Sequence, residues 1–391
     1  MSVPSKKLLR TRIIRSLRSQ GYAIRDGRIS LPPDLDKDGR RRIHELAVAK
    51  RLSVAQPRMQ RFEDGLLRYI ANGDEVDPWS IRPTLHLVKP DTVEEMLFRY
   101  ASLHWSIPVS SGYGRRLRFL VMDDSNGKLI GLFGLGDPVY ALAARDRWVG
   151  WDASAKAKNL YHILDAYVLG AVPPYSFLLC GKLIALLTLS NEVREAFRHR
   201  YSAAKALISG AKREAHLAML TTTSALGRSA IYNRIRVNGF DYWKGVGYTE
   251  GSGDFHFSNG VYADIRGYSE RYCEATAKKE AWGTGFRNKR EVVKKCLPKL
   301  GLSTELLYHG IRREVYLAPL AHNAAEFLRG DANVPEFYDW PSGQLSEIFR
   351  ARWLLPRAER KPEYHNFGRE GYRLWVREQA NVNHSPGGPR P

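Results

Sequence analysis

The sequence predicts a mixed α/β core with a basic helical module before it and helical additions after it. Three observations predict this class. Apolar residues recur at helical spacing near the N-terminus, short apolar runs separated by turn residues fill the middle, and helical patterns return towards the C-terminus. We expect four segments: a basic helical N-terminal module over residues 1–100, the α/β core over 101–265, a helical C-terminal portion over 266–360 and a polar tail over 361–391.

The charge balance of the chain predicts its class of partner. Its 391 residues include 61 lysines and arginines against 41 acidic residues, a net charge of +20. Such a surplus attracts polyanions, of which DNA and RNA are the commonest in a cell. We therefore predict a nucleic-acid partner, and expect DNA. The alternatives are a basic surface without a polyanionic partner and one that meets anionic lipid.

Cysteine usage and hydropathy indicate the compartment. The three cysteines stand far apart, which argues against a disulfide framework or a structural zinc site and fits a reducing cytoplasm. The N-terminus lacks the apolar run of a signal peptide. Pro173-Pro174 divides the apolar stretch 166–189 into pieces too short to cross a bilayer. We expect a cytoplasmic protein with no membrane partner.

The N-terminal module is the first expected phosphate-binding part. The first 61 residues hold 16 basic and 5 acidic side chains. Apolar residues from Leu8 to Leu17 recur at helical spacing, and this helix should end near Gly21. A second basic helix should follow Asp36 and continue to Arg51. The alternative is a pair of amphipathic helices whose basic faces are merely solvated. The cations that we expect to contact phosphate here are Arg40, Arg41 and Arg42.

Turn residues and apolar runs define the expected core. Asn126-Gly127 between two apolar runs is a strong hairpin signal, because both turn positions favour positive φ. The glycine- and aromatic-rich segment 239–257 predicts either a strand-loop-strand that a ligand can approach closely or a core hairpin. Predicted strands cover residues 118–122, 129–135, 163–169 and 217–221, and predicted helices cover 176–189, 228–238, 289–300 and 321–329.

A glycine-flanked basic run, 112–118, is the sharpest local feature. Its arginines suit phosphate contact, and Tyr113 suits base stacking. The alternative is a turn that leads into a strand, with its arginines solvated or paired to acids. Further arginines follow strand ends or lie near acidic residues. The residues that we expect to contact nucleic acid in this part of the chain are Tyr113, Arg115, Arg116, Arg118, Arg145, Arg228 and Arg234.

Four carboxylates form a candidate catalytic set, namely Asp137, Asp146, Asp152 and Asp165. Metal-dependent nucleases gather acids to hold Mg²⁺ or Mn²⁺ for phosphoryl transfer. For each acid by itself a structural role is the alternative. For example, Asp146 can form an ion pair with Arg145, and Asp137 before Pro138 can be a turn residue. No further cofactor is predicted.

Tyr232 and His256 are the remaining catalytic candidates. Tyr232 follows a predicted strand end, where side chains can meet a ligand in the crevice at the edge of a sheet. His256 could act as a general base near neutral pH, although a lone histidine is more often a hydrogen-bonded structural residue. The sequence contains no recognisable phosphate-binding P-loop, so we expect no ATP-driven motor in this chain.

The middle of the chain resembles a known family. The residues that carry the likeness are Trp105 to Arg116, Asp165 to Tyr175, Thr221 to Ser229 and His309 to Ile311. Together they are similar to the Druantia anti-phage system protein A (DruA) family, over roughly residues 5 to 360. The resemblance implies a defence protein that acts with a large helicase-like partner and other subunits. It implies no settled catalytic mechanism.

A second resemblance concerns the fold of the core. The order hairpin, strand, turn, helix, strand, helix is similar to the acetyltransferase-like fold called GNAT, which phage DNA-modification proteins of the Mom type resemble too. In acyltransferases of that fold, backbone N–H groups of a glycine-rich loop bind the cofactor pyrophosphate. The corresponding loop here, Val172 to Tyr175, contains two prolines and so lacks two of those donors. The sequence therefore disfavours ordinary acyl-CoA chemistry.

Three functions follow from these patterns. The first is a DNA-binding component of a Druantia-type defence system that recognises or processes invading DNA for a partner motor. The second is a DNA-modifying or DNA-nicking enzyme built on a GNAT-like core. The third is a scaffold whose basic surface binds an acidic protein partner.

Overall fold

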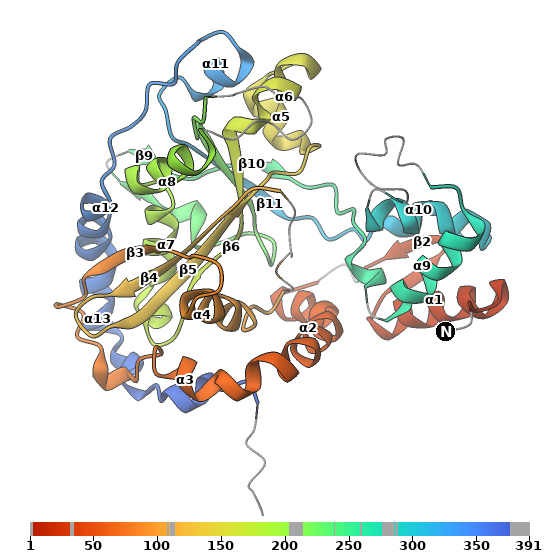
Figure 1. The fold of residues 1–391 in the computed structure, drawn as a ribbon, viewed down its shortest axis with the longest axis horizontal. Helices are drawn as coiled ribbons and strands as arrows, with labels where there is room; N and C mark the ends of the chain where they lie inside the picture. Colours follow the sequence, from red (N-terminus) through yellow and green to blue (C-terminus); the bar gives the residue numbers. More distant parts are fainter. Residues whose placement is uncertain are drawn as a thin grey trace, which may run out of the picture.

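A seven-stranded sheet organises the larger of two lobes (Figure 1). The computed structural model describes residues 3–31, 35–107, 109, 114–202, 214–237, 239–258, 260–275, 286 and 288–375. The strand order is β10-β11-β7-β6-β5-β4-β3, and only the neighbours β6 and β7 run parallel. The predicted mixed α/β class is confirmed. The strands are β3 (Pro83–Leu87), β4 (Arg116–Asp123), β5 (Lys128–Gly136), β6 (Ile163–Ala171), β7 (Met219–Thr223), β10 (Lys244–Tyr248) and β11 (Glu314–Pro319).

The predicted hairpin forms the β4-β5 pair, with Asp123 opposite Lys128. Its turn differs from the expected two-residue type. The loop holds four residues, and the N–H of Gly127 donates to the carbonyl of Asp123 at 2.7 Å. Among the described loop residues only Gly127 has positive φ, at 70°. Gly127 is therefore the described loop residue that adopts the left-handed conformation. Asn126 contributes through its side chain, whose amide donates to Glu75 O and Tyr175 Oη.

The apolar stretch 166–189 is core, as predicted. It contains β6, a turn with a short 3-10 segment (Tyr175–Leu178), and helix α7 (Cys180–Leu187). Leu179 separates the two helical pieces because its φ of 62° is left-handed, so the helix expected from residue 176 begins only at Cys180. In the part of the chain that the structure describes, no helix is both long and apolar enough to span a bilayer.

Helices cover both faces of the sheet. One face packs on α7, α8 (Asn191–Tyr201) and α12 (Ser342–Phe349), because Phe119, Phe133 and Leu220 all project to that side. The opposite face is covered in two parts, by α4 (Val93–Ser102) over the hairpin and by α5 (Ala143–Val149) and α11 (Ala324–Arg329) over β7 and β11. The remaining helical elements of this lobe are α3 (Glu63–Leu67), α6 (Ala153–Asn159), a π-helical stretch (Arg350–Leu354) and α13 (Leu355–Arg360).

The smaller lobe joins two distant parts of the chain. Helix α1 (Lys6–Ser19) packs Leu9, Ile13 and Leu17 into one apolar cluster with helices that come at least some 250 residues later. The small lobe thus consists of residues 3–31, 254–275 and 288–313, and its own apolar cluster is separate from those of the sheet. Its other elements are the hairpin β1 (Ala23–Arg25) and β2 (Arg28–Ser30), α9 (Val261–Tyr272) and α10 (Lys289–Lys299).

Helix α2 (Lys37–Met59) links the two lobes (Figure 1). Near its start, Ile43 belongs to the small-lobe cluster, while Leu52 and Met59 pack against the cluster under α4. The predicted basic helix is therefore present, but residues 1–100 contribute to both lobes. The division of the chain at residues 100, 265 and 360 remains a prediction about independent folding units.

Two expectations about the later chain are wrong. The sequence predicts a helix over residues 228–238, but the structure has one 3-10 turn (Tyr232–Arg234) and a small hairpin of β8 (Arg236–Val237) and β9 (Phe240–Asp241). Aromatic packing overrides the helical pattern, because Tyr232 is buried between Trp243 and Tyr316. Likewise, the segment after residue 265 is not only helical, since β11 lies inside the sheet between β7 and β10.

Candidate functional site

Asp137 is held by Arg115. The Arg115 guanidinium pairs with Asp137 at 2.7 Å and donates to the carbonyl of Tyr161, over whose ring it also lies. Only 14% of the Arg115 side chain is exposed. Arg115 is therefore paired to an acid, which is the alternative that the sequence left open.

Asp146 anchors a second internal network. It pairs with Arg145 and Lys156, both at 2.7 Å, and accepts a hydrogen bond from the indole of Trp151. Burial alone would raise the pKa of Asp146, but the bonds from Lys156 and Arg145 lower this pKa below its usual value. Arg145 is fully buried and also donates to two backbone carbonyls. The predicted Arg145–Asp146 ion pair is confirmed.

The four acids do not form one metal centre. Asp152 caps α6 by accepting from the N–H of Ala155 at 2.7 Å. Asp165 lies in β6 and accepts from the Thr221 hydroxyl at 2.7 Å, and burial raises its pKa to about 6. Within the described residues, no group of three or more His, Cys, Asp or Glu side chains is arranged to hold a metal ion.

Asp165 and Tyr232 lie near each other beside the parallel pair β6-β7. The pairing of these strands runs to Asp165 and Thr221, and the Thr222 hydroxyl donates to the carbonyl of Ala166 one residue further on. Burial raises the pKa of the Tyr232 phenol, and the nearby Asp165 carboxylate raises it further. Lys182 at the start of α7 donates to the carbonyls of Ala230 and Ile231, which fixes the segment in place.

His256 lies in the small lobe, apart from these acids. Its Nε2 is 2.7 Å from the carbonyl of Leu306, and burial lowers its pKa to about 4. The rings of Tyr22 and His309 lie within 6 Å of it. His256 is therefore surrounded by a buried aromatic cluster, in keeping with its structural alternative.

The predicted nucleic-acid contacts divide into two groups. Arg118 pairs with Glu95, Arg41 pairs with Asp38, and Arg40 donates to the carbonyls of Leu35 and Arg312. With Arg115 and Arg145 these side chains bond other groups of the protein, although the Arg41–Asp38 pair lies on the surface. Tyr113 lies outside the described residues. The predicted cations that are at least partly exposed and whose side chains form neither an ion pair nor a hydrogen bond in the described chain are Arg42, Arg116, Arg228 and Arg234.

Two comparisons with known proteins bear on this arrangement. The family model named Druantia protein DruA matches residues 34–330. A Druantia protein DruA of Escherichia coli (strain UMEA 4076-1) is 40% identical over 368 residues, which cover 94% of this chain and 89% of that protein. The chain belongs to the DruA family. No solved structure matches it.

Membership in the DruA family confirms the first resemblance and implies a component of the Druantia anti-phage system. The family model begins after α1 and the β1-β2 hairpin, and it ends beyond β11. It therefore covers all seven strands of the sheet together with α9 and α10 of the small lobe.

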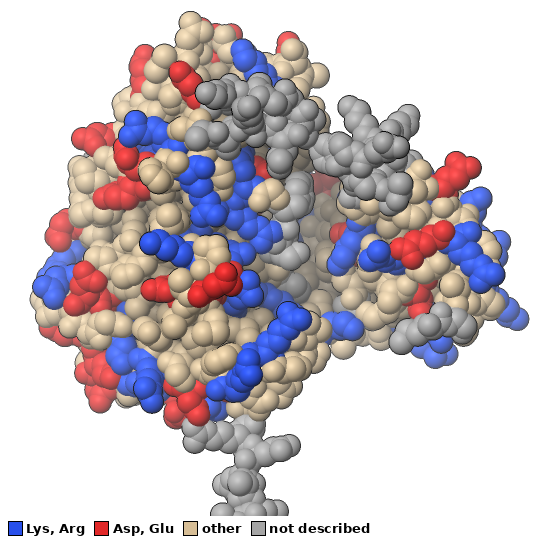
Figure 2. Space-filling view, viewed as in Figure 1, with Lys and Arg blue, Asp and Glu red and all other residues tan. Residues whose placement is uncertain are grey.

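The small lobe of this DruA-family chain concentrates positive charge. Its three segments carry 17 basic and 7 acidic side chains, a balance of +10 within a chain of +20. On α1 the apolar side faces the core, and every lysine and arginine of the helix is exposed. Figure 2 shows Lys and Arg side chains over this lobe and in a band that crosses the larger lobe towards it.

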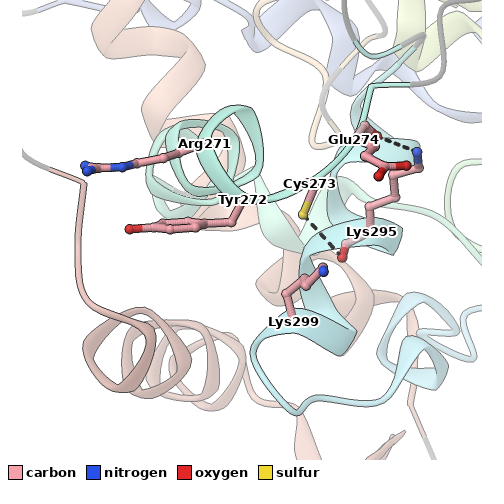
Figure 3. A pocket seen from close by; sticks show the side chains of 6 residues that line it. All are labelled: Arg271, Tyr272, Cys273, Glu274, Lys295 and Lys299. Atoms are coloured by element: carbon pink, nitrogen blue, oxygen red, sulfur yellow. Dashed lines mark hydrogen bonds between the residues drawn. The ribbon is translucent and has the colours of Figure 1, made fainter.

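Sequence reasoning missed the cations that α9 and α10 add to this surface. Arg271, Lys295 and Lys299 line an open cavity of about 690 Å³ at the ends of these helices, beside Tyr272 (Figure 3). Lys295 is tied to the carbonyl of Glu274, whereas Arg271 and Lys299 are exposed. The signal was present in the basic run 289–299, but only the fold places that run in the same lobe as α1.

Proposed function

We propose that this DruA-family protein is a DNA-binding component of a Druantia defence system and that its small lobe meets the DNA backbone. The observation that carries the proposal is the charge of that lobe, +10 over three segments, with all basic residues of α1 turned outwards. Lysine and arginine on one exposed surface neutralise phosphates and release condensed counterions. The helicase-like partner implied by the family resemblance would then act on the DNA that this protein holds.

Removing three cations from α1 should weaken DNA binding. Lys7, Arg15 and Arg18 lie on one stripe of the helix and are exposed. Alanine at these three positions preserves the helix. We expect duplex affinity to fall at least about tenfold near physiological salt. The slope of log affinity against log salt should become shallower by about 1 for each DNA phosphate that is no longer neutralised. Fluorescence anisotropy at several salt concentrations measures both.

The matched control removes the same charge from the larger lobe. Arg68, Lys89 and Arg200 are exposed there and form no ion pair in the described chain. Their triple alanine variant should bind duplex DNA nearly as well as the parent. Binding that does not depend on salt, or an equal loss in both variants, would contradict a DNA-binding small lobe. Binding to an acidic protein without nucleic acid would favour the scaffold function instead.

We also propose that the sheet lobe is an acetyltransferase-like core. The strand order supports this, because an antiparallel run from β3 to β6 is followed by the parallel strand β7 across α7. Ile231 occupies the start of α7, because its side chain lies 3.3 Å from a Cβ built on Gly181. This packing disfavours an acyl-CoA molecule in the same place.

A DNA-modifying or DNA-nicking activity remains a second proposal, and the Asp165 carboxyl group, whose charge acts on the nearby Tyr232 phenol, favours it. A buried carboxyl group with a pKa of about 6 is able to exchange a proton near neutral pH. Asp165→Asn should abolish any change that the purified protein makes to DNA with Mg²⁺, Mn²⁺ or acyl-CoA, while DNA binding persists. Mass spectrometry and gel analysis of the DNA measure it. DNA left unchanged by the parent protein under all three conditions would refute the activity.

A further inference from the structure

The edge of the sheet carries a cavity that the small-lobe proposal does not use. It lies along β10, the edge strand, and has a volume of about 700 Å³. Helix α5, the loop after β7 and the start of β11 complete its walls. A cavity of this size is in the range that holds a small organic ligand.

Three cations converge on this cavity from different elements. Arg147 comes from α5, Arg228 from the loop after β7, and Lys244 from β10. All three are exposed, and none forms an ion pair in the described part of the chain. The two carboxylates of the lining have other partners, since Asp241 pairs with Arg236 and Glu314 accepts from the Tyr316 hydroxyl. Like charges held together repel one another, so the cavity favours an anionic ligand.

Aromatic and amide groups line the same cavity. Trp148 is half-buried in its wall, and Trp243 is fixed by donating its indole N–H to the carbonyl of Ala185 at 3.1 Å. Asn233 also lines the cavity. An indole beside cations suits a base attached to a phosphate, and a side-chain amide in the wall suits the polar edge of that base.

One position of the β10 wall carries no side chain. Gly245 lines the cavity between Lys244 and Val246, and a Cβ there would lie 3.1 Å from Oε1 of Glu314. A larger residue at this position would crowd Glu314, so the glycine keeps this part of the wall low. Cations that suit a phosphate, aromatic side chains that suit a base and a glycine position on β10 therefore lie around one cavity.

We propose that this cavity binds a single nucleotide unit, with its phosphate on Arg147, Arg228 and Lys244 and its base against Trp148. The unit is either an unpaired residue of DNA or a free nucleotide. In the first case the inference deepens the proposed DNA function and rests on it, because the cavity would receive one nucleotide of a strand whose backbone is held elsewhere. In the second case it stands independently of DNA.

The test measures nucleotide and duplex binding separately on the full chain. The probes are dAMP, ATP, a short single-stranded oligonucleotide, the same oligonucleotide with abasic sites, and a duplex. We expect Trp148→Leu, and Arg147→Gln with Arg228→Gln, to weaken binding of the single strand or of the free nucleotides at least about tenfold. Duplex affinity should remain within about twofold, because the small lobe is untouched. Arg198→Gln, at an exposed residue of α8, is the matched control and should change neither.

The outcomes separate the two sources and the two proposals. Preference for the oligonucleotide identifies an unpaired DNA residue, and preference for dAMP or ATP identifies a free nucleotide. Equal affinity for the abasic oligonucleotide, or competition by inorganic phosphate as strong as by nucleotide, would overturn the base-binding site. Absence of binding to every single-stranded and free probe would overturn it as well. Loss of duplex binding in the α1 variant, with nucleotide binding kept, supports the small-lobe proposal independently.

Discussion

Arg145→Ala is expected to lower the free energy of unfolding by about 3–5 kcal/mol, the cost of breaking a buried ion pair by removing one partner. The Arg145 side chain has no exposed surface, and its guanidinium bonds Asp146 and the carbonyls of Val139 and Tyr140. Its charge also stabilises the buried Asp165 carboxylate. Alanine would remove the donor from the carbonyls of Val139 and Tyr140 and would leave Asp146 with Lys156 and Trp151 as its remaining side-chain donors.

The control for this prediction lies on the neighbouring helix. Asp152→Ala removes the exposed cap of α6 and should cost only about 1 kcal/mol. Urea denaturation followed by circular dichroism compares the two variants. If Arg145→Ala cost no more than Asp152→Ala, the network around Asp146 would not stabilise the sheet lobe as its burial indicates.

Stability is expected to fall steeply as the pH drops from about 6.5 towards 4. Burial lowers the pKa of His44, His104 and His256 to about 4 and that of His309 to about 3. The folded state therefore keeps these rings neutral, while the unfolded chain protonates them near pH 6.5. Their stabilising contribution is complete above that pH and is lost as the pH falls towards the folded values. Each contributes about 1.4 kcal/mol per pH unit in this window.

Proton counting tests this expectation. The slope of the unfolding free energy against pH should correspond to three or four protons taken up on unfolding, and His44→Asn with His309→Asn should reduce that number by about two. His199→Asn replaces an exposed histidine of α8 and should leave it unchanged. A slope of one proton or fewer in the parent would show that the buried rings titrate normally.

Local patterns predicted those elements whose partners are near in sequence. The α1 helix ends at Ser19 as its apolar spacing and Gly21 predict, and the β4-β5 hairpin forms around Gly127. Strand β11 escaped prediction because its neighbours β7 and β10 come from distant parts of the chain. The helix expected after Arg228 failed for a related reason, since Tyr232 packs on Tyr316 from that same missed strand.

The candidate site was predicted less well than the fold. A basic run does not reveal which of its arginines find an acid, and Arg115 and Arg118 meet Asp137 and Glu95, each more than twenty positions away. The four acids looked like a set in the sequence, but each takes a separate structural partner. Of the predicted site residues that the structure describes, Arg228 lines the cavity beside β10, and its cationic companions Arg147 and Lys244 carry no motif.

The interleaving of α1 with α9 and α10 has a consequence for synthesis and for handling the protein. The first helix leaves the ribosome early, yet the surfaces that bury Leu9 and Ile13 are not made until residue 300 has been translated. Until then the apolar side of α1 is not buried and is accessible to chaperones or to other nascent chains, while the sheet begins to assemble. Deleting the first twenty residues for expression of the protein would therefore remove a helix of the hydrophobic core.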